Sequence, residues 1–554
     1  MNTRRTKTLS GLAFFLELFR QERARYLCVF ALVAFCCAAA CLSPWLQRFA
    51  IDAIQSGNLE RIVVFSLCAA VAFGAWRTGE NMRSFLTAQL YIRLERTMKR
   101  RVFRHLLELP LSLLRIDGAG YYAGRFQTDV EAMLRHYASG IFNLANHGTK
   151  IVCGLCVCAA ADWRFGILLP LIVLIDVLLT LRFRRRQYKL SVRILENRAA
   201  AAQTAQNLLG KSKLVKTDAL GELAGARYAD DMDRLADLRM KRLWRETLFR
   251  SCMRGIPAVC FLALYVLGVR NILRDQWTLG MLWSMFGYLF LILNPLQAFC
   301  SGLLAMQESA AASKRLQELF RHLPENVASG KRVDAVRGDL EFRDVVFSYG
   351  GGRKILDGAS FSVAAGEFVG LAGESGAGKS TVAALILRLC DPASGEILLD
   401  GVPLRDFELK GLRARIGFIG QNVEFFHASL RENLSVGQDF SNERLHEVLR
   451  EVGMEERVRR DPKGLDLPIY EDQGNFSGGE LLRLALAREL LRNPAVCIFD
   501  EITANLDPET EASVMDLLRR RLAGRTVLLV SHRTSTLRKT DRVLTLANGR
   551  IRSG

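Results

Sequence analysis

The sequence predicts two parts of different fold class: an α-helical transmembrane part of six helices with long cytoplasmic extensions, followed by an α/β part. Residues 1–320 contain long apolar runs, whereas residues 338–554 alternate short β-rich runs with helical stretches. Half of the 554 residues are hydrophobic and the mean hydropathy is +0.12, although 24% of the residues are charged. This composition excludes a disordered chain and a small disulfide-stapled scaffold.

Six apolar runs in the first part are candidates for crossing a membrane. A helix needs about 20 apolar residues to span a bilayer, and several of the runs reach this length. The second run is short, and the third is interrupted by His147 and Lys150. We expect a transmembrane domain over residues 1–322, with spans near residues 26–46, 60–78, 137–161, 165–183, 252–273 and 279–304.

Basic residues beside these runs predict the topology. The first 25 residues and the loops 77–139 and 182–250 hold 34 Lys and Arg residues, whereas the alternate loops and their edges hold five. Because positive charge favours the cytoplasmic side, both termini are expected in the cytoplasm. The net charge of +19 would also suit a nucleic-acid-binding protein, but it flanks apolar spans, so we expect a lipid bilayer and no nucleic acid as partner.

The start of the chain mimics a targeting peptide. Glu17 and Arg20 interrupt its apolar stretch, and no clear cleavage site follows, so we expect an elbow helix at the membrane surface. The cytoplasmic loops 77–139 and 182–250 are far longer than a turn requires and favour helix. Folded as helical hairpins, they would extend roughly 45 Å from the membrane.

Eleven of the thirteen cysteines lie in or beside the apolar runs. Cys153, Cys156 and Cys158 have the spacing of a metal motif, but they lie inside an apolar run, and no second set of ligands accompanies them in the sequence. We therefore interpret the cysteines as small apolar residues of membrane helices.

After a polar linker, residues 323–337, the second part begins with a phosphate-binding pattern. The run 368–372 predicts a buried strand, 379–389 predicts a helix, and G-x-x-x-x-G-K-S lies between them. The glycines let backbone N–H groups surround phosphate oxygens at the helix N-terminus. The candidate ATP-binding residues are Gly373, Glu374, Ser375, Gly376, Ala377, Gly378, Lys379, Ser380 and Thr381.

Two carboxylates follow an apolar strand predicted at 495–499. Behind a phosphate loop, such a pair forms the second half of an ATPase site, although an acidic pair alone is more often the start of a loop. Asp500 and Ser380 would hold Mg²⁺, Lys379 would reach the β- and γ-phosphates, and Glu501 would polarise the attacking water.

Ser477, Gly478 and Gly479 precede another helical run. With Glu480 they match a capping box, which is the purely structural interpretation. The adjacent glycines also expose a helix N-terminus to which an anion can bind. This surface has no phosphate of its own, so a second copy of the chain would have to supply one.

The order and spacing of these motifs resemble those of ABC transporters. Residues 338–554 resemble the nucleotide-binding domain of the family, and residues 1–320 resemble the six-helix membrane domain of its exporters. Segments 109–133, 208–228 and 293–299 are similar to the two intracellular loops and the last span. The resemblance implies coupling helices near residues 113–122 and 215–226 that dock onto the nucleotide-binding domains.

The resemblance also implies roles for four further residues. Tyr349 would stack on adenine, and Asp507 would face the partner subunit at the ATP. Gln421 would sense Mg²⁺ and the attacking water, and His532 would contact the γ-phosphate, so both are candidate catalytic residues. The chain departs from the family pattern without losing a catalytic group at Phe476, Glu480, Gly420 and Ala504.

The resemblance therefore implies an ATP-hydrolysing half-transporter, with ATP and Mg²⁺ as cofactors, that dimerises and moves a substrate out of the cytoplasm or inner leaflet by alternating access. Both halves of a nucleotide site are intact, which favours a homodimer over a heterodimer with a paralogue. A membrane-bound ATPase with a regulatory or sensing role and no translocation stays open as the alternative. Lipid, peptide, drug, haem and thiol substrates all fit. With no transit peptide apparent, a multi-pass protein of the bacterial inner membrane is expected.

Asp176 lies within the apolar run 168–181. An ionised carboxylate at mid-bilayer costs about 2.5–3.5 kcal/mol, so it should face a cavity or a partner. Two interpretations stay open. Asp176 either is protonated or pairs with a polar group such as Lys150 and fixes helix packing, or it lines the substrate pathway and favours cationic or hydrogen-bonding substrates.

Overall fold

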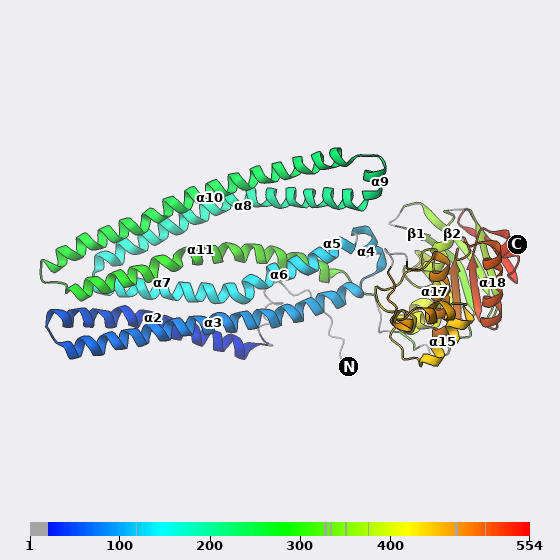
Figure 1. The fold of residues 1–554 in the computed structure, drawn as a ribbon, viewed down its shortest axis with the longest axis horizontal. Helices are drawn as coiled ribbons and strands as arrows, with labels where there is room; N and C mark the ends of the chain where they lie inside the picture. Colours follow the sequence, from blue (N-terminus) through cyan, green and yellow to red (C-terminus); the bar gives the residue numbers. More distant parts are fainter. Residues whose placement is uncertain are drawn as a thin grey trace. The chain divides into compact units, whose positions relative to one another are not determined.

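The computed structural model describes residues 20–553 except 21, 118, 326–329, 333–334, 350–351, 375, 471–474 and 505. The chain forms two compact units, one of residues 1–104 and 120–322, the other of residues 105–119 and 323–554 (Figure 1). The expected elbow helix falls mostly on residues 1–19, which lie outside the described residues.

The first unit is helical, as the apolar runs predict. Within the described residues, six helices are long and apolar enough to cross a membrane. They are α2 (Arg23–Gln55), α3 (Leu59–Leu107), α7 (Ile141–Ala161), α8 (Trp163–Gly210), α10 (Gly221–Ile272) and α11 (Leu279–Arg321). Each overlaps one predicted run. α7 begins four residues after the predicted start at 137, because the wider π-helical turn η2 (Arg135–Gly140) precedes it, and α10 ends one residue before the predicted end at 273.

Side-chain exposure in these helices fits an apolar surrounding. On α3, Val63, Leu67 and Val71 recur every four residues on one face and are 57–65% exposed. Residues at this spacing share one side of a helix, so a continuous apolar stripe faces outward. Pro44 lies within α2, where a membrane helix tolerates it when neighbours pack closely, and a side chain at Gly287 of α11 would contact it.

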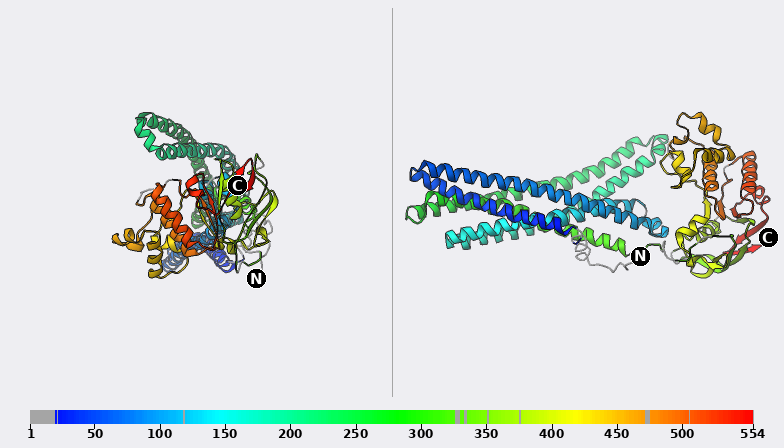
Figure 2. Two further views of the ribbon diagram at one scale, coloured as in Figure 1. Left: turned by 90° about the vertical axis from the view of Figure 1, so that its right-hand side faces the viewer. Right: turned by 90° about the horizontal axis from the view of Figure 1, so that it is seen from below.

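The two long extensions beyond the apolar runs are helices, as the loop lengths predict. α8 and α10 run side by side and are joined by the short helix α9 (Ser212–Thr217), and both views show this end diverging from the other helices of the unit (Figures 1 and 2). The short helix thus begins three residues before the segment 215–226 that we expected, which spans its end and the start of α10.

The first expected coupling segment, residues 113–122, overlaps two short helices. α4 (Leu111–Asp117) and α5 (Ala119–Gly124) are followed by the π-helical turn η1 (Arg125–Asp129) and α6 (Val130–Leu134). Residues 105–119 belong to the second unit, where the backbone N–H of Glu325 donates to the carbonyl of Glu108 at 2.6 Å.

The second unit contains two β-sheets. A four-stranded antiparallel sheet has the order β2-β1-β4-β5, and a six-stranded, mainly parallel sheet has the order β10-β9-β3-β8-β7-β6. The strands are β1 (Leu340–Ser348), β2 (Lys354–Val363), β3 (Phe368–Gly373), β4 (Ser394–Leu399), β5 (Val402–Pro403), β6 (Ile416–Ile419), β7 (Val496–Asp500), β8 (Thr526–Val530), β9 (Arg542–Ala547) and β10 (Arg550–Ser553).

Helices cover these sheets and complete two apolar cores. They are α12 (Lys379–Ile386), α13 (Leu409–Arg415), α14 (Leu430–Ser435), α15 (Asn442–Glu451), α16 (Glu455–Arg460), α17 (Gly478–Arg492), α18 (Pro508–Arg521) and α19 (Thr534–Leu537), with short 3₁₀ turns at η3 (Leu404–Asp406) and η4 (Gly464–Asp466). The helix expected at 379–389 ends earlier, at Ile386, because Arg388 has a left-handed backbone with φ of 50°. The strands β7 and β8 are buried throughout, so the residues that follow them are held at one edge of the sheet.

Candidate functional site

The phosphate-binding pattern forms the expected strand–loop–helix turn. β3 ends at Gly373 and α12 begins at Lys379, after Gly378 with φ of 106°. A Cβ at Gly378 would lie 2.5 Å from Cγ2 of Ile355, so both the backbone angle and the space require glycine. Ser375 lies outside the described residues.

The side chain of Lys379 folds back over the loop. Its Nζ donates to the carbonyl oxygens of Gly373 at 2.8 Å and of Glu374 at 2.9 Å, and the residue is 6% exposed. The ammonium group of Lys379 can exchange these carbonyl oxygens for phosphate oxygens, because a charged acceptor binds it more strongly.

Asp500 connects the second motif to this loop. It ends β7 and is 6% exposed, and the side chain of Ser380 lies close enough to favour the ionised form of its carboxyl. Burial, with the nearby Glu501, raises the pKa of the Asp500 carboxyl above its ordinary value. The buried Asp500 carboxylate and the neighbouring Ser380 hydroxyl are hard oxygen ligands, which Mg²⁺ prefers.

Three predicted residues meet at Glu501. Nε2 of Gln421 donates to Oε2 of Glu501 at 3.2 Å, and Nδ1 of His532 lies 3.5 Å from Oε1. Glu501 itself has φ of 54°, a left-handed conformation that is uncommon for a residue with a side chain and often occurs at functional sites. The backbone N–H of Glu501 donates to the carbonyl of Val530 at 3.0 Å, which holds the strained residue against β8.

The structure adds a network that the sequence reasoning missed. Arg533, next to His532, donates to the carbonyl oxygens of Ala504 at 2.7 Å and Leu506 at 3.0 Å, and to the Glu511 carboxylate at 2.8 Å. Burial raises the pKa of Glu511, but the hydrogen bonds from Thr536, Ser535 and Arg533 together hold it below its ordinary value. The sequence gives no sign of these contacts of Arg533, because two of its acceptors are backbone carbonyl groups, which every residue has.

The remaining predicted residues are accessible. Ser477 and Gly478 are exposed at the N-terminus of α17, and the capping box of Ser477 and Glu480 is present, as the structural interpretation expected. Asp507 caps α18 by accepting from the N–H of Thr510 at 3.0 Å. Within the described residues, no hydrogen bond joins Ser477 or its two glycines to the phosphate-binding loop of the same chain.

Tyr349 lies just after β1 and is 49% exposed. Its ring meets Phe347 edge-on, with centroids 4.8 Å apart, so one face of the tyrosine stays available for stacking.

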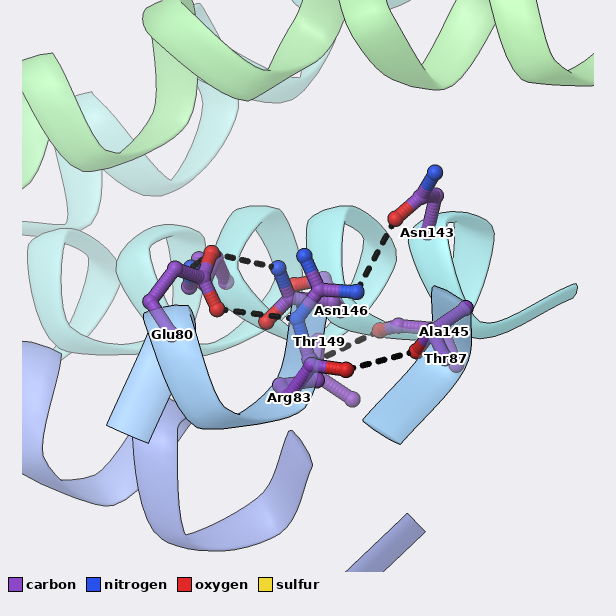
Figure 3. A network of polar contacts seen from close by, with 8 residues as sticks. Glu80, Arg83, Thr87, Asn143, Ala145, Asn146 and Thr149 are labelled. Atoms are coloured by element: carbon purple, nitrogen blue, oxygen red, sulfur yellow. Dashed lines mark hydrogen bonds and ion pairs between the residues drawn. The ribbon is translucent and has the colours of Figure 1, made fainter. Parts of the chain in front are cut away.

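In the first unit, a buried polar network joins α3 to α7 (Figure 3). The carboxylate of Glu80 accepts from Arg83, Asn146 and Lys150, each at 2.9 Å, and Arg83 donates to Asn143 at 3.0 Å. Lys150 is thus paired with Glu80, which corrects the suggestion that it pairs with Asp176.

Asp176 is 5% exposed on α8, and Thr180, one turn later, is equally buried. Oδ2 of Asp176 has no hydrogen-bond partner among the described residues. Sequence reasoning identified Asp176 as unusual, but it could not identify Glu80 because that residue lies just beyond an apolar run.

Comparison with known proteins agrees with this geometry. Residues 26–296 match the family model of the ABC transporter transmembrane region, and residues 356–504 match the ABC transporter model. The chain is 28% identical over 457 residues to an ATP-dependent lipid A-core flippase of Vibrio vulnificus (strain YJ016), covering 82% of this chain and 78% of the relative. A flippase of the same name from Haemophilus influenzae (strain 86-028NP) is 29% identical over 464 residues, with the same coverage of both chains.

Among solved structures, a bacterial Atm1-family ABC exporter with ATP bound superposes with a TM-score of 0.83 at 26% identity, over 96% of this chain and 95% of that one. The fold class, the ATP-binding domain and the coupling of an ATPase to export are thereby confirmed, and the regulatory alternative is not favoured. The chain is a multi-pass protein of the bacterial inner membrane, and it belongs to the ABC transporter family as an ATP-driven exporter half-transporter.

Proposed function

We propose that this exporter works as a homodimer that binds two ATP molecules, each between the phosphate-binding loop of one subunit and the Ser477–Gly479 segment of the other. The observation that carries the catalytic part is the convergence of Gln421 and His532 on the carboxylate of Glu501. Glu501 would accept a proton from the attacking water, because its carboxylate is oriented from both sides.

Each other residue has a role that fits its surroundings. Lys379 would move from its loop carbonyls to the β- and γ-phosphates, and His532 would contact the γ-phosphate once ATP is bound. Tyr349 would stack on adenine with its exposed face, and Asp507 would lie at the partner's ATP. The backbone N–H groups of Gly376, Ala377, Gly378 and Thr381 would bind phosphate oxygens.

Mg²⁺ fits the hard oxygen ligands of Asp500 and Ser380, and Gln421, which is hydrogen-bonded to Glu501, would be the third residue to hold it. When bound, Mg²⁺ would neutralise charge that develops on the phosphate oxygens. Asp500 must then be ionised, which its burial opposes and the divalent cation favours.

Apolar residues on the cytoplasmic part of α10 support the dimer. Met240, Leu243, Trp244 and Leu248 precede the predicted span at 252–273, and they are 55–68% exposed in the single chain. Water makes such a stripe unfavourable, so a second copy would cover it.

We also propose that both termini are cytoplasmic, because 34 of the Lys and Arg residues around the spans lie on the side of the N-terminus and the two long extensions. The extensions formed by α8 and α10 are too polar at their α9 end to enter a bilayer, which supports the same orientation. Labelling of single cysteines at residues 213 and 275 of a cysteine-free variant, in inside-out and right-side-out vesicles, tests this topology.

The catalytic assignment is tested with Glu501→Gln in the full-length transporter reconstituted in proteoliposomes. We expect ATP binding to persist, hydrolysis to fall by about 10²–10⁴-fold, and a closed, nucleotide-loaded dimer to accumulate. Glu509→Gln changes an exposed glutamate on α18 and should hydrolyse ATP at the wild-type rate. Near wild-type hydrolysis by Glu501→Gln would contradict the assignment.

Transport is tested in inside-out vesicles by ATP-dependent accumulation. The named activity of the curated relatives makes lipids the first substrates to assay, followed by thiol compounds and drugs. A substrate should stimulate the ATPase of the wild type and should not stimulate that of Glu501→Gln. A purified protein that is monomeric and inactive would contradict the homodimer.

A further inference from the structure

Three cysteine thiols meet inside the helical unit, between α2 and α7. Cys37 and Cys41 lie one helical turn apart on α2, and Cys153 approaches them from α7. The three Sγ atoms all lie within 4.8 Å of one another, and Sγ of Cys37 is 3.7 Å from Sγ of Cys153. The sequence spacing of Cys153, Cys156 and Cys158 does not indicate this cluster, because two of its three thiols lie on α2. Cys37 and Cys153 are 116 residues apart in the sequence.

The sulfur positions fit coordination of one metal ion. A bond between Zn²⁺ and a cysteine sulfur is about 2.3 Å long, so three sulfurs around one ion lie about 3.8–4.0 Å apart in tetrahedral or trigonal geometry. The Sγ atoms of Cys37 and Cys153, 3.7 Å apart, are already close to this spacing. The other two Sγ–Sγ distances are at most 4.8 Å, so each would have to shorten by no more than about 1 Å. Rotation of the thiol side chains alone supplies shifts of this size.

We propose that Cys37, Cys41 and Cys153 form a binding site for a thiophilic d¹⁰ metal ion, Cu(I) or Zn(II), that ties α2 to α7. Three sulfur ligands without a neighbouring carboxylate or imidazole in the cluster select soft ions over Mg²⁺ or Ca²⁺. The other two cysteines of the motif take no part: Cys156 is exposed, and Cys158 packs in the apolar cluster with α8, α10 and α11.

The charge of the neighbouring network complements such a site. Lys150 lies one turn before Cys153 on α7, and the hydrogen-bonded group of Glu80, Arg83 and Lys150 carries a net charge of +1. Zn(II) with three thiolates, or Cu(I) with two thiolates and one thiol, carries −1. Because an uncompensated charge is unfavourable between membrane helices, each group would lower the free energy of the other.

The surrounding helices hold the sulfurs in place. The hydroxyl of Tyr288 on α11 donates to the carbonyl of Cys41 at 2.9 Å, and a Cβ at Gly154 would lie 2.7 Å from Cγ1 of Ile292. α11 therefore packs closely against both ligand-bearing helices, which pre-organises the site. Cys37 is buried, and Cys41 and Cys153 are partly buried.

The test uses the full-length transporter, purified in detergent and kept reduced, without nucleotide. Cd(II), as a spectroscopic substitute for Zn(II), and Cu(I) under anaerobic conditions are titrated separately, and the ultraviolet thiolate-to-metal charge-transfer band is recorded. We expect one ion per chain. Cys37→Ser, Cys41→Ser and Cys153→Ser should each weaken binding more than about 100-fold, since loss of a supporting residue alone costs about 10–100-fold.

Cys156→Ser is the matched control, because it lies on the same helix outside the cluster, and it should bind as the wild type does. A second measurement needs no variant: bound Cd(II) should protect cysteines 37, 41 and 153 from alkylation, read by mass spectrometry, while Cys156 stays reactive. The ion should also raise the Tm of the wild type and leave that of the triple serine variant unchanged.

Three results would overturn the proposal. The first is the absence of a charge-transfer band with either metal, and the second is wild-type affinity in Cys153→Ser. The third is a Cys37–Cys153 disulfide in protein purified without reductant, combined with no metal uptake after reduction, which would identify a redox pair instead. Size-exclusion profile and basal ATPase activity check that each variant is folded.

Discussion

Nδ1 of His532 lies 3.5 Å from Oε1 of Glu501, although the two residues follow different strands. His532 follows β8, Glu501 follows β7, and Gln421 follows β6, and these three strands are neighbours in the order β8-β7-β6. The parallel strands therefore bring the three side chains to one edge of the sheet. With Gln421 on its other oxygen at 3.2 Å, the Glu501 carboxylate is held in one orientation.

Replacing Gln421 with Glu should inhibit hydrolysis by more than loss of a hydrogen bond alone. A second carboxylate about 3 Å from Glu501 would repel its negative charge, so the two carboxylates together would bind a proton more readily than either alone. We expect the rate to fall about tenfold or more and the acidic limb of the pH–rate profile to move to higher pH. Gln421→Ala, which lacks the added charge, is the control and should lower the rate without moving that limb.

Arg533 should position the loop that carries Asp507. Its guanidinium holds the carbonyl groups of Ala504 and Leu506, so Arg533→Ala should release this loop and lower kcat while the KM for ATP changes little. We expect a loss of unfolding free energy of roughly 1–3 kcal/mol, because the Glu511 carboxylate would lose its ion pair and keep only the hydrogen bonds from Ser535 and Thr536. Arg538→Ala, an arginine at the end of α19, is the control, and equal effects of the two changes on kcat would contradict the positioning role.

The same network predicts a pH dependence of stability. The pKa of Glu511 is lowered from its ordinary value of 4.5, so the stabilisation is fully present above pH 4.5 and is lost as the pH falls through the lower, folded-state value. Glu511→Gln should therefore be less stable than wild type at pH 7, and the difference should shrink in acid. Thermal unfolding across this range measures it, and a pH-independent difference would exclude the charge as its cause.

The nucleotide-binding motifs could be recognised in the sequence because each is a short local pattern in which the backbone conformation requires particular residue types. Gly378 shows this: its positive φ and its contact with Ile355 both demand glycine. Contacts between distant helices were not readable. Glu80 pairs with Lys150 across 70 residues, and Cys37 meets Cys153 across 116, through side chains whose types are common in many roles. Backbone acceptors such as the carbonyl of Leu506 leave no trace in the sequence at all.

Breaking the Glu80 network should destabilise the helical unit. Lys150 is 4% exposed and its Nζ also lies 5.4 Å from the Trp76 ring centroid, so Glu80→Gln would leave a buried ammonium with weaker partners. We expect a loss of about 3–5 kcal/mol. Glu80→Gln with Lys150→Met should recover much of it, whereas exposed Glu60→Gln should have little effect. Additive effects in this double-mutant cycle, measured by thermal unfolding in detergent, would show that the pair is not coupled.

Asp176 presents the sharpest test of the membrane pathway. It is 5% exposed, and its Oδ2 lacks a hydrogen-bond partner among the described residues, while Lys150 is occupied by Glu80. A buried carboxylate in this situation lowers stability, so Asp176→Asn should raise the unfolding free energy by about 1–3 kcal/mol. If Asp176 contacts substrate, this gain should come with loss of transport and of substrate-stimulated ATPase, while basal ATPase persists. Thr180→Val, one turn away and equally buried, removes a polar group without changing charge and should leave transport intact. Unchanged transport together with lower stability in Asp176→Asn would assign Asp176 to helix packing instead.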